Sequence, residues 1–287
     1  MTKPPLLRVE HLKTYFPIRT GLLQRTTGWV KAVDDVSFEI GEGETLGLVG
    51  ESGCGKTTVG RTILRLIPAT SGRVYYKGRN IFDLPAREMM KLRREIQIIF
   101  QDPAGSLNPR MRVSRIVGEP LQVHGLASGP ELRKRVEELL ERSGLPGAAA
   151  DRYPHEFSGG QRQRIGIARA LALEPKLIIC DEPTSALDVS IQSQILNLLK
   201  ELQEDFGLSF LFISHDMAVI QHVCHRIAVM YRGKIVEMSE RDRIYDEPQH
   251  AYTKALLSAV PEAKPRQKKR RIVYTGEGES AVAVEQA

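Results

Sequence analysis

A glycine-rich segment near the start of the chain carries residues suited to binding phosphate. Residues 50–57 fit the pattern G-x-x-x-x-G-K-[ST]. In this pattern glycines let backbone N–H groups approach an anion, Lys56 reaches the β- and γ-phosphates of a nucleotide, and the Thr57 hydroxyl binds Mg²⁺. Many kinds of nucleotide-binding protein share this loop, so it indicates a ligand class only. The candidate phosphate-binding residues are Gly50, Glu51, Ser52, Gly53, Cys54, Gly55, Lys56, Thr57 and Thr58.

A second glycine-containing segment reduces the number of classes of nucleotide-binding protein that fit the sequence. Ser158, Gly159, Gly160 and Gln161 precede apolar residues at helical spacing and have the S-x-x-Q form of a capping box. This predicts another helix N-terminus at which an anion could dock. One nucleotide needs one phosphate-binding loop, so the second helix suggests a site that another subunit completes.

Polar side chains that could carry out chemistry follow three apolar segments. Gln101 follows residues 96–100, Asp181 and Glu182 follow 177–180, and His215 follows 209–213. Open α/β sheets bind ligands at the carboxyl ends of their strands. Asp181 suits the Mg²⁺ shell, and Glu182 suits polarisation of an attacking water.

Strands and helices predicted from the pattern would position these residues. Residues 45–49 are predicted to be a buried strand, and residues 57–67 a helix that Pro68 stops. The opening residues predict two strands, 7–16 and 30–40, which a loop at 17–29 connects.

The middle of the chain differs in character from its flanks. Residues 103–156 contain short helical segments separated by Gly and Pro, which predicts an inserted helical subdomain. We therefore expect an α/β fold with a P-loop (RecA-like) nucleotide-binding core, an N-terminal antiparallel β-subdomain and an inserted α-helical subdomain. The predicted ATPase domain is 7–260, divided into 7–102, the insertion 103–156 and 157–260, followed by a basic, flexible tail at 261–287.

Residues 264–271 of that tail carry six basic residues and no acidic one, which equals the net charge of +6 of the whole chain. The rest of the chain is neutral, which argues against a nucleic-acid-binding face. A solvated tail and an association with anionic lipid headgroups are the two interpretations. Apolar runs fall short of the roughly 18 residues that span a bilayer, and the N-terminus does not resemble a secretory signal, so we expect a cytoplasmic protein.

The three cysteines, Cys54, Cys180 and Cys224, lie far apart and fit neither a disulfide pattern nor a zinc-binding one. Cys54 lies in the phosphate-binding loop beside Lys56, a setting that favours thiolate. A small residue tolerated at that position is the simpler interpretation.

The order and spacing of these motifs resemble the ATP-binding subunit of an ABC transporter, over residues 7–260. The resemblance implies that Gln101 contacts Mg²⁺ and the attacking water, and that His215 senses the γ-phosphate. It also implies that Asp188 lies in a loop crossing between two ATPase subunits. Phe16 is the candidate for stacking on adenine, with Tyr15 and Trp29 as alternatives.

The same resemblance implies partners and a mechanism. Two ATPase subunits, identical or related, would bury two ATP molecules between them, with Ser158 and Gly160 capping the γ-phosphate of nucleotide held by the partner. Closure on binding and reopening after hydrolysis would drive two transmembrane permease subunits, which the helical insertion contacts. An extracytoplasmic substrate-binding protein would deliver the cargo to a complex whose ATPase lies on the cytoplasmic face of the membrane.

Further stretches resemble the di- and oligopeptide (and nickel) importer subgroup. They are residues 101–110, 153–157, 185–190 and the pattern Pro248-x-His250-x-Tyr252-Thr253. Many members continue into a tail with clustered cysteines that bind an iron–sulfur centre. This chain has no cysteine after Cys224, so we predict no cluster.

Two other classes of protein fit less well. ABC ATPases that act on DNA or ribosomes carry coiled-coil or zinc insertions or two cassettes, whereas this chain has one phosphate loop and neither kind of insertion. A P-loop kinase would leave residues 158–161 unexplained. The sequence does not distinguish a peptide from nickel or another small solute as cargo.

Overall fold

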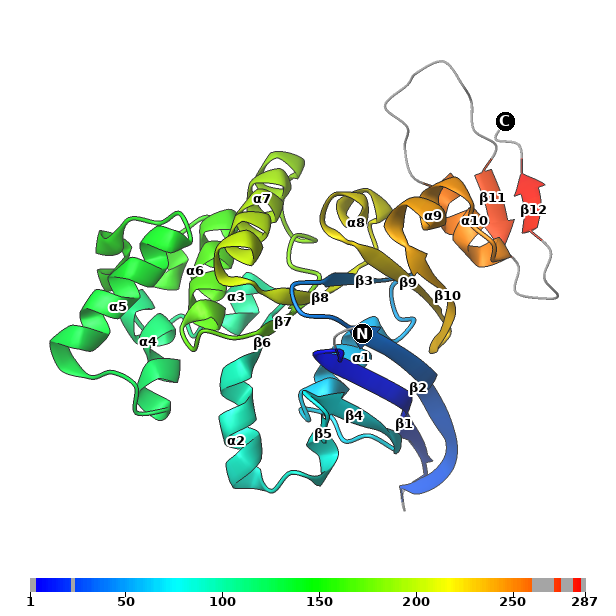
Figure 1. Cartoon of the computed structure of the whole chain (residues 1–287), viewed down its shortest axis with the longest axis horizontal. Helices are drawn as coiled ribbons and strands as arrows, with labels where there is room; N and C mark the ends of the chain where they lie inside the picture. Colours follow the sequence, from blue (N-terminus) through cyan, green and yellow to red (C-terminus); the bar gives the residue numbers. More distant parts are fainter. Residues whose placement is uncertain (1–3, 22–23, 260–270, 275–280, 285–287) are drawn as a thin grey trace. The chain divides into compact units, whose positions relative to one another are not determined.

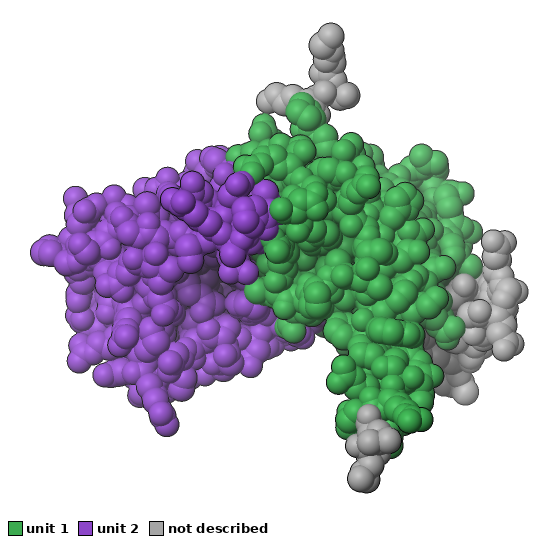
Figure 2. All heavy atoms as spheres, turned by 90° about the horizontal axis from the view of Figure 1, so that it is seen from below, with its two compact units in different colours: residues 1–83, 212–287 green, residues 84–211 purple. Residues whose placement is uncertain are grey.

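The structure is a computed structural model that describes residues 4–21, 24–259, 271–274 and 281–284 (Figure 1). The chain divides into two compact units, shown in Figure 2. Unit 1 comprises residues 1–83 and 212–287, and unit 2 comprises residues 84–211. The strand β8 (Ser209–Ser214) runs across the boundary between these two ranges.

An antiparallel sheet forms the N-terminal part of unit 1, with strand order β2-β1-β4-β5. Its strands are β1 (Leu7–Thr20), β2 (Arg25–Ile40), β4 (Ser71–Tyr76) and β5 (Arg79–Asn80), followed by the 3₁₀ helix η1 (Ile81–Asp83). Apolar side chains alternate toward the interior, where Leu7, Leu12 and Val36 are fully buried. This confirms the predicted antiparallel β-subdomain.

The predicted loop at 17–29 is wrong. β1 and β2 continue through these residues as a long hairpin, with Pro17 opposite Trp29. Only residues 21–24 separate the two strands. Pro17 lies beyond Lys13, the last β1 residue that pairs with β4, so the strand tolerates its missing N–H.

The rest of unit 1 holds β3 (Thr45–Val49), β9 (Arg226–Tyr231) and β10 (Lys234–Glu240). β3 and β9 are parallel, and β9 and β10 form an antiparallel hairpin. The helices are α1 (Lys56–Ile63), α8 (Met217–Val223), α9 (Arg241–Asp246) and α10 (Ala251–Ser258). α1 ends at Ile63 rather than the predicted residue 67, because the chain turns at Arg65, whose φ is 54°.

Unit 2 contains the parallel strand pair β6 (Ile96–Ile99) and β7 (Leu177–Asp181). Its helices are α2 (Ala86–Glu95), α3 (Pro103–Ser106), α4 (Val113–Val123), α5 (Gly129–Arg142), α6 (Gly159–Leu171) and α7 (Val189–Phe206), with the 3₁₀ helices η2 (Gly147–Asp151) and η3 (Pro154–Glu156). A core of apolar residues that includes Val117, Leu140 and Phe157 joins the helical segments to α6. The inserted helical subdomain is therefore confirmed.

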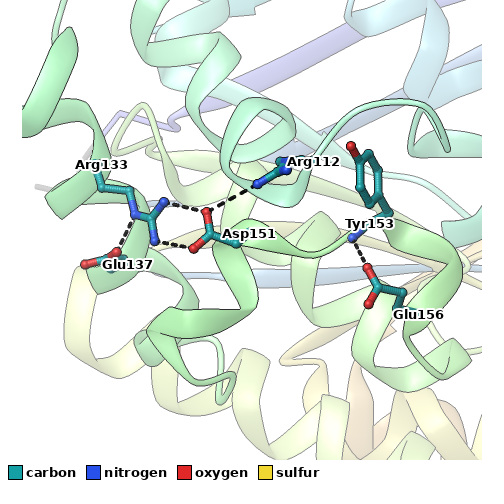
Figure 3. Close-up of polar contacts among 6 residues, drawn as sticks. All are labelled: Arg112, Arg133, Glu137, Asp151, Tyr153 and Glu156. Carbon is teal, nitrogen blue, oxygen red and sulfur yellow. Dashed lines mark hydrogen bonds and ion pairs between the residues drawn. The ribbon is translucent and has the colours of Figure 1, made fainter.

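Surface ion pairs connect the segments of this helical region (Figure 3). The guanidinium of Arg133 donates to both carboxylate oxygens of Asp151, at 2.6 and 2.7 Å, and also contacts Glu137. The hydrogen bond from Arg133 lowers the pKa of the Asp151 carboxyl. These side chains are about half exposed, so each pair contributes little to stability, but they fix η2 against α5.

The tail contains more structure than predicted. β11 (Arg271–Tyr274) and β12 (Ala281–Val284) pair in an antiparallel hairpin beside α10 (Figure 1). This hairpin was not predicted because the apolar residues 272–274 directly follow the basic run 264–271. The remaining basic residues, 264–270, lie outside the described residues. Within the part of the chain that the structure describes, none of the helices has the length and apolar character to cross a membrane.

Candidate functional site

The phosphate-binding loop of unit 1 connects β3 to α1 and lies against backbone on two sides. A Cβ atom on Gly55, whose φ is 109°, would come within 1.9 Å of the Ala32 carbonyl oxygen. A Cβ on Gly50 would come within 2.1 Å of the Met230 carbonyl oxygen. The glycines therefore meet two demands, an unusual backbone conformation and close packing against β2 and β9.

The side chain of Lys56 lies inside this loop. It is only 3% exposed, and its Nζ donates to the carbonyl oxygens of Gly50 and Glu51, at 2.8 Å each. Ser52 and Gly53 at the tip of the loop are exposed. Thr57 and Thr58 follow Lys56 in the first turn of α1. The structure thus brings the candidate phosphate-binding residues together around one helix N-terminus.

Cys54 does not have the thiolate character that its position suggested. Burial raises the pKa of its thiol, and the nearby Lys56 only partly offsets this effect. The sequence showed a lysine two residues away, but it did not show that the Cys54 side chain points into the interior. Cys54 is therefore a small buried residue of the loop.

Gln101 and Glu182 meet in unit 2. They follow β6 and β7, which are parallel neighbours with Ile99 opposite Cys180, so their side chains emerge at the same edge. The amide Nε2 of Gln101 donates to Glu182 Oε2 at 2.9 Å. Asp181, the last residue of β7, is 1% exposed. Two neighbouring strand ends therefore place an amide and two carboxylates together.

Glu182 has an unusual backbone conformation. Its φ is 48°, in the left-handed region that residues with a side chain rarely adopt, and its side chain is 8% exposed. Strained backbone of this kind costs about 1–3 kcal/mol and is concentrated at functional sites. The strand β7 ends at Asp181, and the unusual conformation of Glu182 begins directly after it.

The second glycine-containing segment begins α6, as predicted, with a capping box. The Gln161 N–H donates to Ser158 Oγ at 3.3 Å, and the Ser158 N–H donates to Gln161 Oε1 at 3.0 Å. Ser158 and Gly159 are exposed. Gly160 packs against α7, where an added Cβ would lie 2.4 Å from Ile191 Cγ2. Gly160 is thus required by helix packing, whatever else it contacts.

The subgroup stretch 153–157 leads the chain into α6. The Tyr153 N–H donates to Glu156 Oε2 at 2.6 Å across η3 (Figure 3), and Phe157 is buried in the helical core. Arg162 on α6 donates to the Pro154 carbonyl oxygen at 2.8 Å. These contacts fix the direction in which the chain enters Ser158.

Asp188 caps the N-terminus of α7. Its Oδ1 accepts from the Ile191 N–H at 3.0 Å and from the Ser190 hydroxyl at 3.0 Å. The backbone hydrogen bond from Ile191 and the bond from Ser190 lower the pKa of the Asp188 carboxyl, so it is ionised at neutral pH. A fixed negative charge therefore stands at this helix start.

Two further predicted residues belong to unit 1. His215 directly follows β8 and is exposed, and Asp216 then caps α8. Phe16 lies on β1 opposite Val30 and is 39% exposed, which suits a stacking role. Trp29 is more exposed than Phe16, and the Tyr15 hydroxyl donates to Asp34, so Tyr15 already has a partner.

One residue at the phosphate-binding loop escaped the sequence analysis. The hydroxyl of Tyr252 accepts a hydrogen bond from the Glu51 N–H at 3.0 Å. Burial raises the pKa of Tyr252 to about 12, so its hydroxyl stays protonated at neutral pH. The pattern that contains Tyr252 had been noticed only as a subgroup marker, and 201 residues separate it from Glu51.

Comparisons with known proteins agree with this arrangement. Residues 33–185 match the family described as ABC transporter, and residues 236–285 match the family described as oligopeptide/dipeptide transporter, C-terminal region. The oligopeptide transport ATP-binding protein AppF of Bacillus subtilis is 55% identical, over 95% of this chain and 84% of that protein. The glutathione import ATP-binding protein GsiA of Escherichia coli is 56% identical, over 94% of this chain but only 44% of that protein.

Solved structures show the same fold. The ATP-binding cassette MJ0796, in a dimeric post-hydrolysis state bound to ADP and Pi, has a TM-score of 0.72 and 32% identity, covering 82% of this chain and 98% of that one. The protein cbiO1 from Clostridium perfringens, part of the ABC transporter complex cbiONQ, has a TM-score of 0.71 and 30% identity, covering 85% of this chain and 92% of that one.

The phosphate-binding loop, the strand-end carboxylates and the cassette fold define a P-loop ATPase. More particularly, the chain belongs to the ABC transporter family, as an ATP-hydrolysing subunit of its oligopeptide/dipeptide branch.

Proposed function

We propose that this ATPase powers the import of small peptides, with Glu182 polarising the water that attacks the γ-phosphate of ATP. The observation that carries the catalytic part is the hydrogen bond from Gln101 to Glu182 at the ends of two adjacent parallel strands. It fixes the orientation of one Glu182 oxygen, as a general base requires. His215, just past β8, would donate to the γ-phosphate and respond to its loss.

The nucleotide would bind through the loop of unit 1. Lys56, with its ammonium group inside the loop, would contact the β- and γ-phosphates, the N–H groups from Gly53 to Thr58 would surround them, and Phe16 would stack on adenine. Hydroxyl, carboxylate and amide oxygens are ligands that Mg²⁺ prefers, so Thr57, Asp181 and Gln101 fit this ion. When bound, Mg²⁺ would neutralise charge on the phosphates.

A second ATPase subunit would complete each site. Ser158, Gly159, Gly160 and Gln161 begin a helix whose N-terminus suits an anion, and Ser158 is exposed, which supports contact with the γ-phosphate of nucleotide held by the partner. The dimeric state of the MJ0796 cassette supports the same interpretation. Asp188 would lie in the loop between the subunits, and loss of the γ-phosphate would reopen the pair.

The cargo and the other partners are proposed from the relatives. The match of residues 236–285 to an oligopeptide/dipeptide transporter region supports a peptide cargo, as do the names of AppF and of GsiA, whose substrate glutathione is itself a small peptide. Two transmembrane permease subunits and an extracytoplasmic binding protein would complete the importer. The ATPase would then lie on the cytoplasmic face of the membrane.

Uptake of a labelled dipeptide into vesicles that contain the assembled transporter tests this proposal. Glu182→Gln keeps the shape and size of the side chain but removes its charge, so ATP binding should persist while hydrolysis and uptake fall about 10²- to 10⁴-fold. Glu201→Gln, an exposed carboxylate on α7, is the matched control and should transport normally.

The outcomes separate the catalytic proposal from the cargo proposal. Near-normal hydrolysis by Glu182→Gln would remove Glu182 as the base. Normal hydrolysis by the unsubstituted transporter, with uptake of nickel in place of any peptide, would overturn the proposed cargo.

A further inference from the structure

The peptide group between Gly50 and Glu51 is held from both sides. Its carbonyl oxygen, on Gly50, accepts from Lys56 Nζ at 2.8 Å. Its N–H, on Glu51, donates to the Tyr252 hydroxyl at 3.0 Å. A peptide group is planar, so fixing its N–H also fixes the direction of its carbonyl oxygen. The Tyr252 hydroxyl thereby sets the position of an oxygen that binds the Lys56 ammonium.

The side chain of Tyr252 is buried and packed against its neighbours. Its side chain is 2% exposed, and its ring packs on Tyr231 with the ring centroids 4.4 Å apart. Tyr231 ends β9 and follows Met230, whose carbonyl oxygen lies against Gly50. The strand β9 therefore supplies both Tyr231, which packs on Tyr252, and the Met230 carbonyl oxygen, which lies against Gly50.

The segment that carries Tyr252 is anchored to β10. The carboxylate of Glu237 accepts from the N–H groups of Gln249 and His250, at 2.8 and 2.9 Å. Burial alone would raise the pKa of Glu237, but hydrogen bonds, among them those from the N–H groups of Gln249 and His250, lower it. The side chain of His250 then caps α10 by accepting from the Tyr252 N–H at 3.1 Å. The pattern Pro248-x-His250-x-Tyr252-Thr253 thus gives Tyr252 one defined location.

We propose that Tyr252 is a positioning residue for nucleotide binding: through the Gly50–Glu51 peptide group, it orients the Gly50 carbonyl, which helps to hold Lys56 where the β- and γ-phosphates bind. This gives the oligopeptide/dipeptide-type C-terminal region a direct contact with the phosphate-binding loop. The inference rests on the proposed role of Lys56 in binding phosphate.

The test measures nucleotide affinity of the full chain with fluorescent trinitrophenyl-ATP and trinitrophenyl-AMP. Tyr252→Phe removes the hydroxyl and keeps the ring on Tyr231. Losing one hydrogen bond that orients the loop should raise the Kd for trinitrophenyl-ATP about three- to tenfold. The Kd for trinitrophenyl-AMP, which lacks the β- and γ-phosphates, should stay unchanged.

Tyr245→Phe is the matched control. Tyr245 lies in the same C-terminal region, and its hydroxyl donates to the Met217 carbonyl oxygen, away from the loop. It should lower the melting temperature about as much as Tyr252→Phe does and leave both affinities unchanged. Thermal unfolding of each variant therefore separates lost stability from lost positioning.

Lys56→Ala separates failure of the inference from failure of the proposed function. It should weaken trinitrophenyl-ATP binding strongly, and adding Tyr252→Phe should weaken it no further, because the tyrosine acts through the lysine. If Lys56→Ala weakens binding but Tyr252→Phe binds both nucleotides like the unsubstituted chain, or loses affinity for both equally, the inference is overturned. If Lys56→Ala binds normally, the proposed role of Lys56 itself fails, and the inference with it.

Discussion

The helices α1 and α6 both have glycine at their N-termini, but the two helix starts are ordered in different ways. α1 starts after Gly55, which has a left-handed conformation and no side chain that could serve as a cap. α6 starts with Ser158 and Gln161 bonded to one another's backbone. Backbone from β2 and β9 confines the first loop, whereas the second is ordered by its own side chains.

This difference indicates different tasks for the two helix ends. The amides of α1 are directed by a rigid loop and are suited to surrounding several phosphate oxygens without rearrangement. At α6 the Ser158 Oγ accepts from the Gln161 N–H, and its O–H can still donate to a phosphate, so such a contact would leave the cap in place. We therefore expect the first site to determine nucleotide affinity, and the second to respond to the γ-phosphate once another subunit is present.

The largest expected effect comes from disrupting the packing of the phosphate-binding loop at Gly55, directly before α1. Gly55→Ala places a Cβ 1.9 Å from the Ala32 carbonyl oxygen in a backbone conformation with φ of 109°. Strain of this kind should lower ATP affinity about 10- to 100-fold, measured by titration with a fluorescent ATP analogue. Gly53→Ala is the control, because its φ is also positive but no atom lies within 4 Å of the added Cβ. Equal losses in the two variants would show that packing against β2 is unimportant.

A smaller effect should come from the cap of α6. Ser158→Ala removes the hydroxyl, so the free energy of unfolding should fall by about 1 kcal/mol, and hydrolysis by the assembled transporter about tenfold. Nucleotide affinity of the isolated chain should not change. Ser158→Asn preserves a capping side chain, so it should restore the melting temperature but leave hydrolysis low. Full recovery of hydrolysis in Ser158→Asn would show that Ser158 acts only as a helix cap.

The smallest expected effect lies within the same helix. Gly166→Ala adds a Cβ to α6 with no atom within 4 Å, so it should stabilise the protein by about 0.5–1 kcal/mol in denaturant unfolding. Gly160→Ala is the counterpart, since its Cβ would lie 2.4 Å from Ile191 Cγ2, and it should destabilise. Stabilisation by both substitutions would contradict the close packing of α6 on α7.

Features set by neighbouring residues could be predicted from the sequence. The capping box at Ser158, the cap at Asp188 and the left-handed end of α7 at Gly207 each depend on a few consecutive residues. The apolar segments before Gln101 and Asp181 also predicted the strands β6 and β7, whereas their parallel pairing is shown by the structure. Local patterns of this kind carry most of the α/β fold.

Features set by distant residues could not be predicted in the same way. The Tyr252 hydroxyl reaches Glu51 across 201 residues, and Gly160 is limited by a side chain on another helix. The orientation of Cys54 into the interior is equally invisible in the sequence. The hairpin at 17–29 was missed because Pro and Gly in that stretch suggested a loop, whereas pairing with a single neighbouring strand tolerates both.

Ile191 contacts residues at the start of α6 and at the start of α7. Its N–H holds the carboxylate of Asp188, and its side chain fills the space beside Gly160. A shift of the residues around Gly160 would therefore press on the same isoleucine whose amide fixes Asp188. The starts of α6 and α7 are thus connected through a single residue.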